Sequence, residues 1–171
     1  MSKKAIIKRL KWYYPLERMP TFISFPLAMI YFIINYPSRH IILIIYGFVL
    51  CIIILYQGQR YWKLKLYRLT GKAFDQTDNL RFFKKSKRVN LILIGLLPII
   101  FIIQIYIIDD SDINYKLVIW GGMAGLFGVL EHINYYYKQL MVDTIADLKY
   151  IFKNGKLKDA SLAKDLREGE I

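Results

Sequence analysis

Residues 117–137 read LVIWGGMAGLFGVLEHINYYY, an apolar stretch long enough to form a membrane helix. Small residues recur in it at spacings of three and four, which places them on one helix face. Such a face lets helix backbones approach closely in lipid, where apolar burial alone does not drive association. We therefore predict a helix-packing face of Gly121, Ala124, Gly125 and Gly128, which packs the bundle or a homo-oligomer.

The same stretch also carries polar residues, Glu131, His132 and Asn134. At about 1.5 Å per residue, Glu131 lies about 21 Å into an apolar core about 30 Å thick. An ionisable side chain at that depth is a functional-site hypothesis, and we group it with Gln104 of the preceding span. Three interpretations stay open: a proton or cation relay, a buried polar latch, or a headgroup-level pair that reaches water. Candidate partners of Glu131 are Arg60, Lys63, Gln57, Gln59 and Gln104.

The composition of the whole chain is that of a membrane protein. Hydrophobic residues make up 56% of the 171 residues and charged residues 22%, and the two classes are segregated along the sequence. The single cysteine, Cys51, excludes an internal disulfide framework and is interpreted as an apolar packing residue. The net charge of +12 does not indicate nucleic acid, because the cations flank hydrophobic spans where membrane topology requires them.

Four hydrophobic stretches are predicted to cross the membrane. They cover residues 19–36, 41–57, 90–108 and 117–137. The basic segment 1–18 is either an amphipathic helix on an anionic leaflet or a flank that only fixes orientation.

Polar segments follow the second and the fourth span. In the connection 58–89, we expect the second helix to stop near Gly71 and the next to begin near Asp75 or Asp78. Segment 138–171 is expected to continue the fourth helix through residue 153, because no helix breaker interrupts it, and to end in a charged tail.

Cations are distributed unevenly among the polar segments. Residues 1–20 carry six, 58–89 carry ten and 135–171 carry seven, whereas the other two turns carry one each. By the positive-inside rule, both termini and the long connection lie in the cytoplasm. The predicted fold is all-α and polytopic, a single membrane domain over residues 1–171. It holds four transmembrane helices in two antiparallel hairpins with cytoplasmic helical extensions.

Three stretches carry a resemblance to a known group of proteins. They are FFKKSKRVNLILIGLLPIIF at 82–101, LEHINYYYKQLMVD at 130–143 and ASLAKDLREGEI at 160–171. This half of the chain resembles small bacterial membrane proteins that are sometimes labelled general stress proteins. The resemblance implies a protein of the bacterial cytoplasmic membrane and assigns neither an activity nor a site residue.

No catalytic signature is present in the sequence: there is no H-E-x-x-H, G-x-S-x-G or Walker motif. We expect no enzyme, no catalytic residue, no cofactor and no metal site. The leading hypothesis is a non-enzymatic bacterial inner-membrane scaffold or partner subunit whose basic cytoplasmic face engages anionic lipid or a cytosolic protein. The cations assigned to this contact are Lys63, Lys65, Arg68, Lys84, Lys85, Lys87 and Arg88.

Two other functions stay open. One is a small oligomeric proton or cation channel, or transporter, that uses Glu131 and His132. The other is a lipid-modifying membrane enzyme, for which the sequence offers no pair of nucleophile and base.

Overall fold

The computed structural model describes residues 3–108, 113–142 and 145–171, and within them the chain is built of helices without a strand. The all-α prediction is therefore confirmed. The helices are α1 (Lys3–Met19), the π-helical turn η1 (Pro20–Ser24), α2 (Phe25–Asn35), α3 (Ser38–Thr70), α4 (Gln76–Ile107), α5 (Tyr115–Tyr136), α6 (Ile145–Asn154) and α7 (Ser161–Glu168).

Three of these helices, α3, α4 and α5, are long and apolar enough to cross a membrane. The segment Pro20–Asn35 is a shorter apolar helix of the same character. The prediction of a membrane protein with transmembrane helices therefore stands on three helices, and the first predicted span, residues 19–36, corresponds to the shorter one.

The N-terminal helix differs from the expected one. No helix starts at residue 19, because α1, η1 and α2 follow one another without a break. Pro26 has no N–H for a helical bond, and the wide turn η1 directly precedes it. Residues 3–18 of the basic segment are thus part of a helix that runs on into apolar sequence. Leu10 of this segment is buried, and α1 packs against α3.

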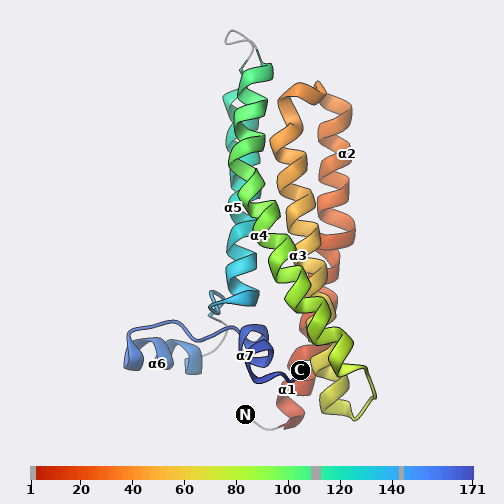
Figure 1. Cartoon of the computed structure of the whole chain (residues 1–171), viewed down its shortest axis with the longest axis vertical. Helices are drawn as coiled ribbons and strands as arrows, with labels where there is room; N and C mark the ends of the chain where they lie inside the picture. Colours follow the sequence, from red (N-terminus) through yellow and green to blue (C-terminus); the bar gives the residue numbers. More distant parts are fainter. Residues whose placement is uncertain (1–2, 109–112, 143–144) are drawn as a thin grey trace.

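Helix α3 is the centre of the molecule. It contacts α5, α4 and the N-terminal helices, and its contact with α5 is the largest (Figure 1). The helices therefore pack as a bundle around α3. The α3–α4 connection and both ends of the chain lie at the same end of the bundle (Figure 1), which we call the basic end.

Small residues bring α3 and α5 close together. A Cβ atom added to Gly47 would lie 2.8 Å from the Cβ of Ala124 and 2.9 Å from the backbone nitrogen of Gly125. A Cβ on Gly121 would lie 2.9 Å from Cγ of Leu43. The predicted packing residues of α5 thus lie against another helix of the same chain.

The contacts of Gly125 and Gly128 involve two different helices. Gly128 approaches Leu50 of α3, whereas Gly125 approaches Leu97 of α4. Cys51 is buried there, and its thiol donates to the carbonyl oxygen of Ala124 at 3.3 Å.

Local capping ends α3 and begins α4, as the sequence predicts. Gly71 follows the last residue of α3 with a φ of 72°, a conformation that suits glycine. The side chain of Asp75 accepts a hydrogen bond of 2.8 Å from the backbone nitrogen of Asp78 at the start of α4. Both helices therefore extend well beyond the apolar part of their sequence.

The predicted continuation of α5 through residue 153 is wrong, because α5 ends at Tyr136. The side chain of Asn134 accepts hydrogen bonds from the backbone of Leu140 and Met141 at 2.9 and 3.3 Å, which holds the chain in a turn. The carbonyl of Tyr137 then accepts from the backbone nitrogen of Ala160 at 3.1 Å. The side chain of Asn134 and the backbone of Ala160 thus take the place of the hydrogen-bond partners that a continued α5 helix would provide.

The last segment of the chain returns to the bundle. Helix α6 lies beside the other helices, whereas α7 lies below the end of α5 (Figure 1). Leu162 and Ile171 are fully buried in the same core as Tyr61 and Phe83. The predicted surface tail is therefore a docked segment that covers part of the basic end.

Candidate functional site

Four polar side chains form a buried cluster between the three long helices: Gln57 of α3, Asn90 of α4, and His132 and Tyr136 of α5. The amides of Gln57 and Asn90 exchange two hydrogen bonds, of 2.9 and 2.8 Å. The hydroxyl of Tyr136 donates to Oε1 of Gln57 at 2.7 Å, and Nδ1 of His132 lies 3.3 Å from Nδ2 of Asn90. We call this the buried polar cluster.

The predicted intramembrane residues are distributed differently from the grouping that the sequence indicated. His132 is in the buried polar cluster, whereas Glu131 is half-buried beside it and accepts from Asn134 of its own helix at 3.5 Å. Gln104 lies fourteen residues from Asn90 along α4, about 21 Å at 1.5 Å per residue. There it accepts from the backbone of Leu43 at 2.7 Å and donates to the carbonyl of His40 at 3.1 Å.

The bonding of the cluster favours a latch over a conduction path. Its two amides satisfy each other, and its hydrogen bonds connect α3 to α4 and to α5. Within the described residues, the one buried atom of the cluster without a hydrogen bond is Nε2 of His132. Hydrogen-bonded amides and hydroxyls of this kind join membrane helices, at about 1–2 kcal/mol each in model peptides.

Sequence reasoning missed Asn90 and did not place Gln57 with His132. A signal existed in the spacing of α5: His132 follows Gly128 by four residues, as Gly125 follows Gly121. The face that packs on α3 therefore continues into His132, and Glu131 is turned away by about 100°.

Four cations in the last third of α3 fall into two groups. Three of them, Lys63, Lys65 and Arg68, are predicted contact residues, whereas Arg60 was predicted only as a partner of Glu131. In the first group, Lys65 forms an ion pair of 2.5 Å with Asp165, which also accepts from the hydroxyl of Tyr61 at 2.7 Å. Arg68 forms an ion pair of 2.6 Å with Glu170. The C-terminal segment thus neutralises both cations.

The second group is Arg60 and Lys63, neither of which has a carboxylate partner in the described part of the chain. Nε and Nη2 of Arg60 donate to Oδ1 of Asn79 at 3.1 and 2.8 Å. The guanidinium also lies over the ring of Phe82, 3.9 Å from its centroid. Lys63 is exposed, and its Nζ is 5.6 Å from the centroid of Tyr67. Arg60 is therefore held rigidly although it is not neutralised.

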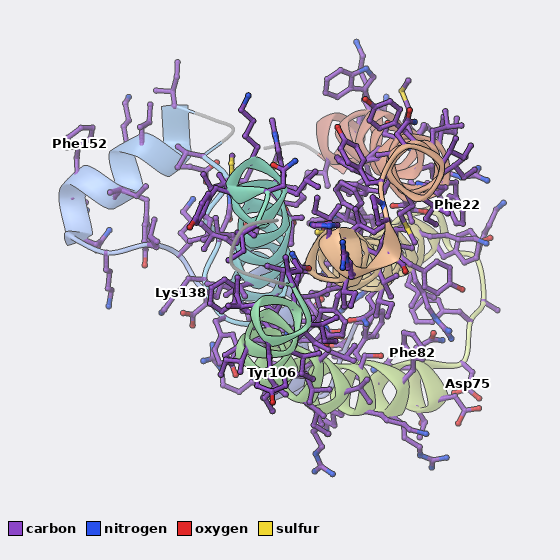
Figure 2. All side chains as sticks on the ribbon, turned by 90° about the horizontal axis from the view of Figure 1, so that it is seen from above. Phe22, Asp75, Phe82, Tyr106, Lys138 and Phe152 are labelled. Atoms are coloured by element: carbon purple, nitrogen blue, oxygen red, sulfur yellow. The ribbon has the colours of Figure 1, made fainter. Side chains whose placement is uncertain are left out.

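A groove of about 470 Å³ lies over these two cations. Its walls come from the N-terminal helix, α3 and the start of α4, and include Arg18, Phe22, Tyr56, Arg60, Lys63 and Asn79. In Figure 2, Phe22 and Phe82 lie on the same side of the molecule, opposite α6 and Phe152. We call this the α3 groove. It combines positive charge with exposed aromatic surface.

The predicted cations of α4 lie elsewhere. Lys84, Lys87 and Arg88 line a second pocket, shared with the end of α5 and with α7. Lys85 is exposed and does not line either of these pockets. The seven predicted contact residues are thus divided among an ion-paired group, two separate pockets and one solvent-exposed lysine.

No family model, no curated protein and no solved structure matches this chain. The resemblance to small bacterial membrane proteins stays a prediction, and the function has to be argued from the geometry alone.

Proposed function

We propose that this chain is a non-enzymatic protein of the bacterial inner membrane that binds an anionic phospholipid at the α3 groove. The observation that carries the proposal is a pair of cations, Arg60 and Lys63, that have no carboxylate partner among the described residues and lie at the end of an apolar strip. A lipid phosphate on the two cations would supply the missing negative charge. The protein would thereby serve as a scaffold anchored to anionic lipid through its basic face.

The exposed strip of α3 has the shape that a phospholipid requires. Val49, Tyr56 and Lys63 recur every seven residues and therefore share one face of the helix. Val49 is 38% exposed and Tyr56 47% exposed, so the apolar part of the strip is exposed at both of these positions. An acyl chain fits the part with Val49 and Tyr56, and the phosphate fits the basic part that follows.

The rigid placement of Arg60 supports phosphate binding. A guanidinium presents a planar fork of donors, and its bonds to Asn79 use Nε and Nη2. Nη1 of Arg60 donates no hydrogen bond to any described residue and can therefore donate to a ligand. Asn79 and Phe82 already fix the side chain of Arg60. Phosphate binding therefore costs less side-chain conformational entropy here than it would at a mobile arginine.

Helix α6 supports the same membrane contact. It lies beside the bundle rather than within it (Figure 1) and exposes Ile145, Leu148 and Phe152, the last being 86% exposed. Lys149 and Lys153 of the same helix are exposed as well. A short helix with exposed apolar residues and cations suits the interface of an anionic leaflet.

The test is thermal unfolding in nanodiscs of phosphatidylglycerol and of phosphatidylcholine. We expect the protein to be more stable in the anionic lipid. Lys63→Gln or Arg60→Gln should each remove about 1 kcal/mol of that difference, the value for one cation near an anionic surface. Lys63→Gln is the safer variant for folding, since Lys63 is exposed and bonds to no other described residue.

Lys85→Gln is the matched control, because it removes the same charge from an exposed site outside the groove. The proposal fails if Lys63→Gln and Arg60→Gln lose no more of the lipid effect than Lys85→Gln does.

A further inference from the structure

The basic end holds a second pocket, of about 550 Å³, on another side of the bundle. It lies between α4 and the C-terminal segment, and the end of α5 closes it. Its charged lining consists of Lys84, Lys87, Arg88, Lys138, Arg167 and a single acid, Asp159. The volume is within the range of pockets that bind small molecules, roughly 300–1,000 Å³.

The charges in this pocket do not balance. Asp159 bonds Lys138 at 2.5 Å and Arg167 at 3.1 Å, so the one carboxylate already serves two cations. Both hydrogen bonds lower the pKa of Asp159 from its ordinary value, which keeps the carboxylate ionised. The three cations of α4 have no carboxylate partner in the described part of the chain.

The three α4 cations are arranged to meet one ligand. Lys87 and Arg88 follow Lys84 by three and four residues, so each of them neighbours Lys84 on the helix surface. The ammonium of Lys87 lies over the ring of Tyr137, 4.1 Å from its centroid, which places it between α4 and α5. Lys84 and Arg88 are exposed on either side of it along the helix.

We propose that this pocket binds a phosphate-bearing anion, which bridges the cations of α4 to Arg167 of α7. Three cations without a carboxylate partner among the described residues suit a ligand with more than one negative charge, and phosphate oxygens accept hydrogen bonds from both lysine and arginine. Such a ligand would come either from solution or from a lipid headgroup. The site shares no residue with the α3 groove and does not depend on the function proposed for that groove.

Binding in this pocket has a structural consequence. Helix α7 supplies one wall, and the ion pairs and buried residues of the C-terminal segment hold that wall in place. A ligand that binds only the docked arrangement stabilises it by mass action. Anion binding should therefore protect the segment that follows Gly155 from proteolysis.

The experiment uses the full chain in nanodiscs of phosphatidylcholine, titrated with pyrophosphate at constant ionic strength. Thermal unfolding and limited proteolysis after residue 155 are the two readouts. We expect pyrophosphate to raise the unfolding temperature and to slow cleavage. In the double variant Lys84→Gln with Arg88→Gln, the half-saturating concentration should rise at least about tenfold, as expected when charge-assisted contacts are lost.

Lys63→Gln and Lys85→Gln are the controls, since each removes one lysine outside this pocket. Both should keep the response to pyrophosphate. A loss with Lys63→Gln as large as with the double variant would show a general charge effect and overturn the site.

A second arm identifies the source of the phosphate. Nanodiscs with phosphatidic acid replace pyrophosphate, and the same variants are compared. Stabilisation by pyrophosphate assigns a soluble ligand, whereas stabilisation by phosphatidic acid alone assigns a lipid headgroup, provided that the double variant loses it. The proposal is overturned if neither ligand produces an effect that the double variant weakens.

Discussion

The two faces of α3 are built on opposite principles. The face toward α5 carries Gly47 and is closed so tightly that a single added carbon would collide with Ala124 and with the backbone of α5. The other face carries Val49, Tyr56 and Lys63, all three of which are exposed. Small residues let two helices pack closely and leave no room for a ligand. Exposed large and charged residues, in contrast, form a surface to which a ligand can bind.

The largest expected effect comes from breaking the closed face. Gly47→Leu puts its Cβ 2.8 Å from that of Ala124 and close to the backbone of Gly125, which cannot move aside as a side chain can. We expect a loss of about 3 kcal/mol in the free energy of unfolding, the upper part of the usual range for overpacking. Thermal unfolding in detergent measures it.

Gly122→Leu is the control for this substitution. A Cβ at Gly122 meets no atom within 4 Å, although Gly122 is the immediate neighbour of the packed Gly121. Its stability should be close to that of the parent. An equal loss of unfolding free energy in Gly47→Leu and Gly122→Leu would mean that the close approach of α3 and α5 at Gly47 does not stabilise the closed face.

A smaller effect is expected from the buried polar cluster, which joins the closed face of α3 to α4. Asn90→Leu leaves the amide of Gln57 without its reciprocal partner. We expect a loss of about 1–2 kcal/mol in unfolding free energy. The double variant with Gln57→Leu should lose less than the sum of the two single variants. Strict additivity would show that the two amides do not act as a unit.

The smallest effect concerns the C-terminal segment and depends on pH. The pKa of Asp159 is lowered by hydrogen bonds from Lys138 and Arg167, so its folded value lies below its unfolded value of about 3.9. The stabilisation is therefore fully present above the unfolded pKa and is lost as pH falls through the folded one. Being at the surface, this contact contributes little.

The check is the rate of proteolysis after residue 155, measured for the parent and for Asp159→Asn between pH 6 and pH 3. The parent should be the more protected of the two at pH 6, and the difference should shrink at the acid end. A difference that grows toward low pH would contradict the account.

Local patterns made part of this structure predictable from sequence. The glycine face of α5 follows from spacing, and the end of α3 and start of α4 follow from Gly71 and Asp75, because these signals act within a few residues. The end of α5 did not follow, since it depends on Tyr137 meeting Ala160 from a distant part of the chain.

The candidate site was predictable in residue type rather than in arrangement. Charge alone could not separate Lys63 from Lys65, because what distinguishes them is Asp165, one hundred residues further along than Lys65. The same limit applied to His132, whose hydrogen-bond partner Asn90 comes from another helix and is brought to it only when the helices pack.

The central claim is that the open face of α3 holds an anionic phospholipid, and lipid retention tests it most directly. The parent, Lys63→Gln and Lys85→Gln would each be extracted from membranes of equal phosphatidylglycerol and phosphatidylcholine content. Native mass spectrometry then counts the bound lipids. We predict one retained phosphatidylglycerol on the parent and on Lys85→Gln, and a clear loss of it on Lys63→Gln. Equal retention on all three proteins, or no preference for the anionic lipid, would contradict the claim.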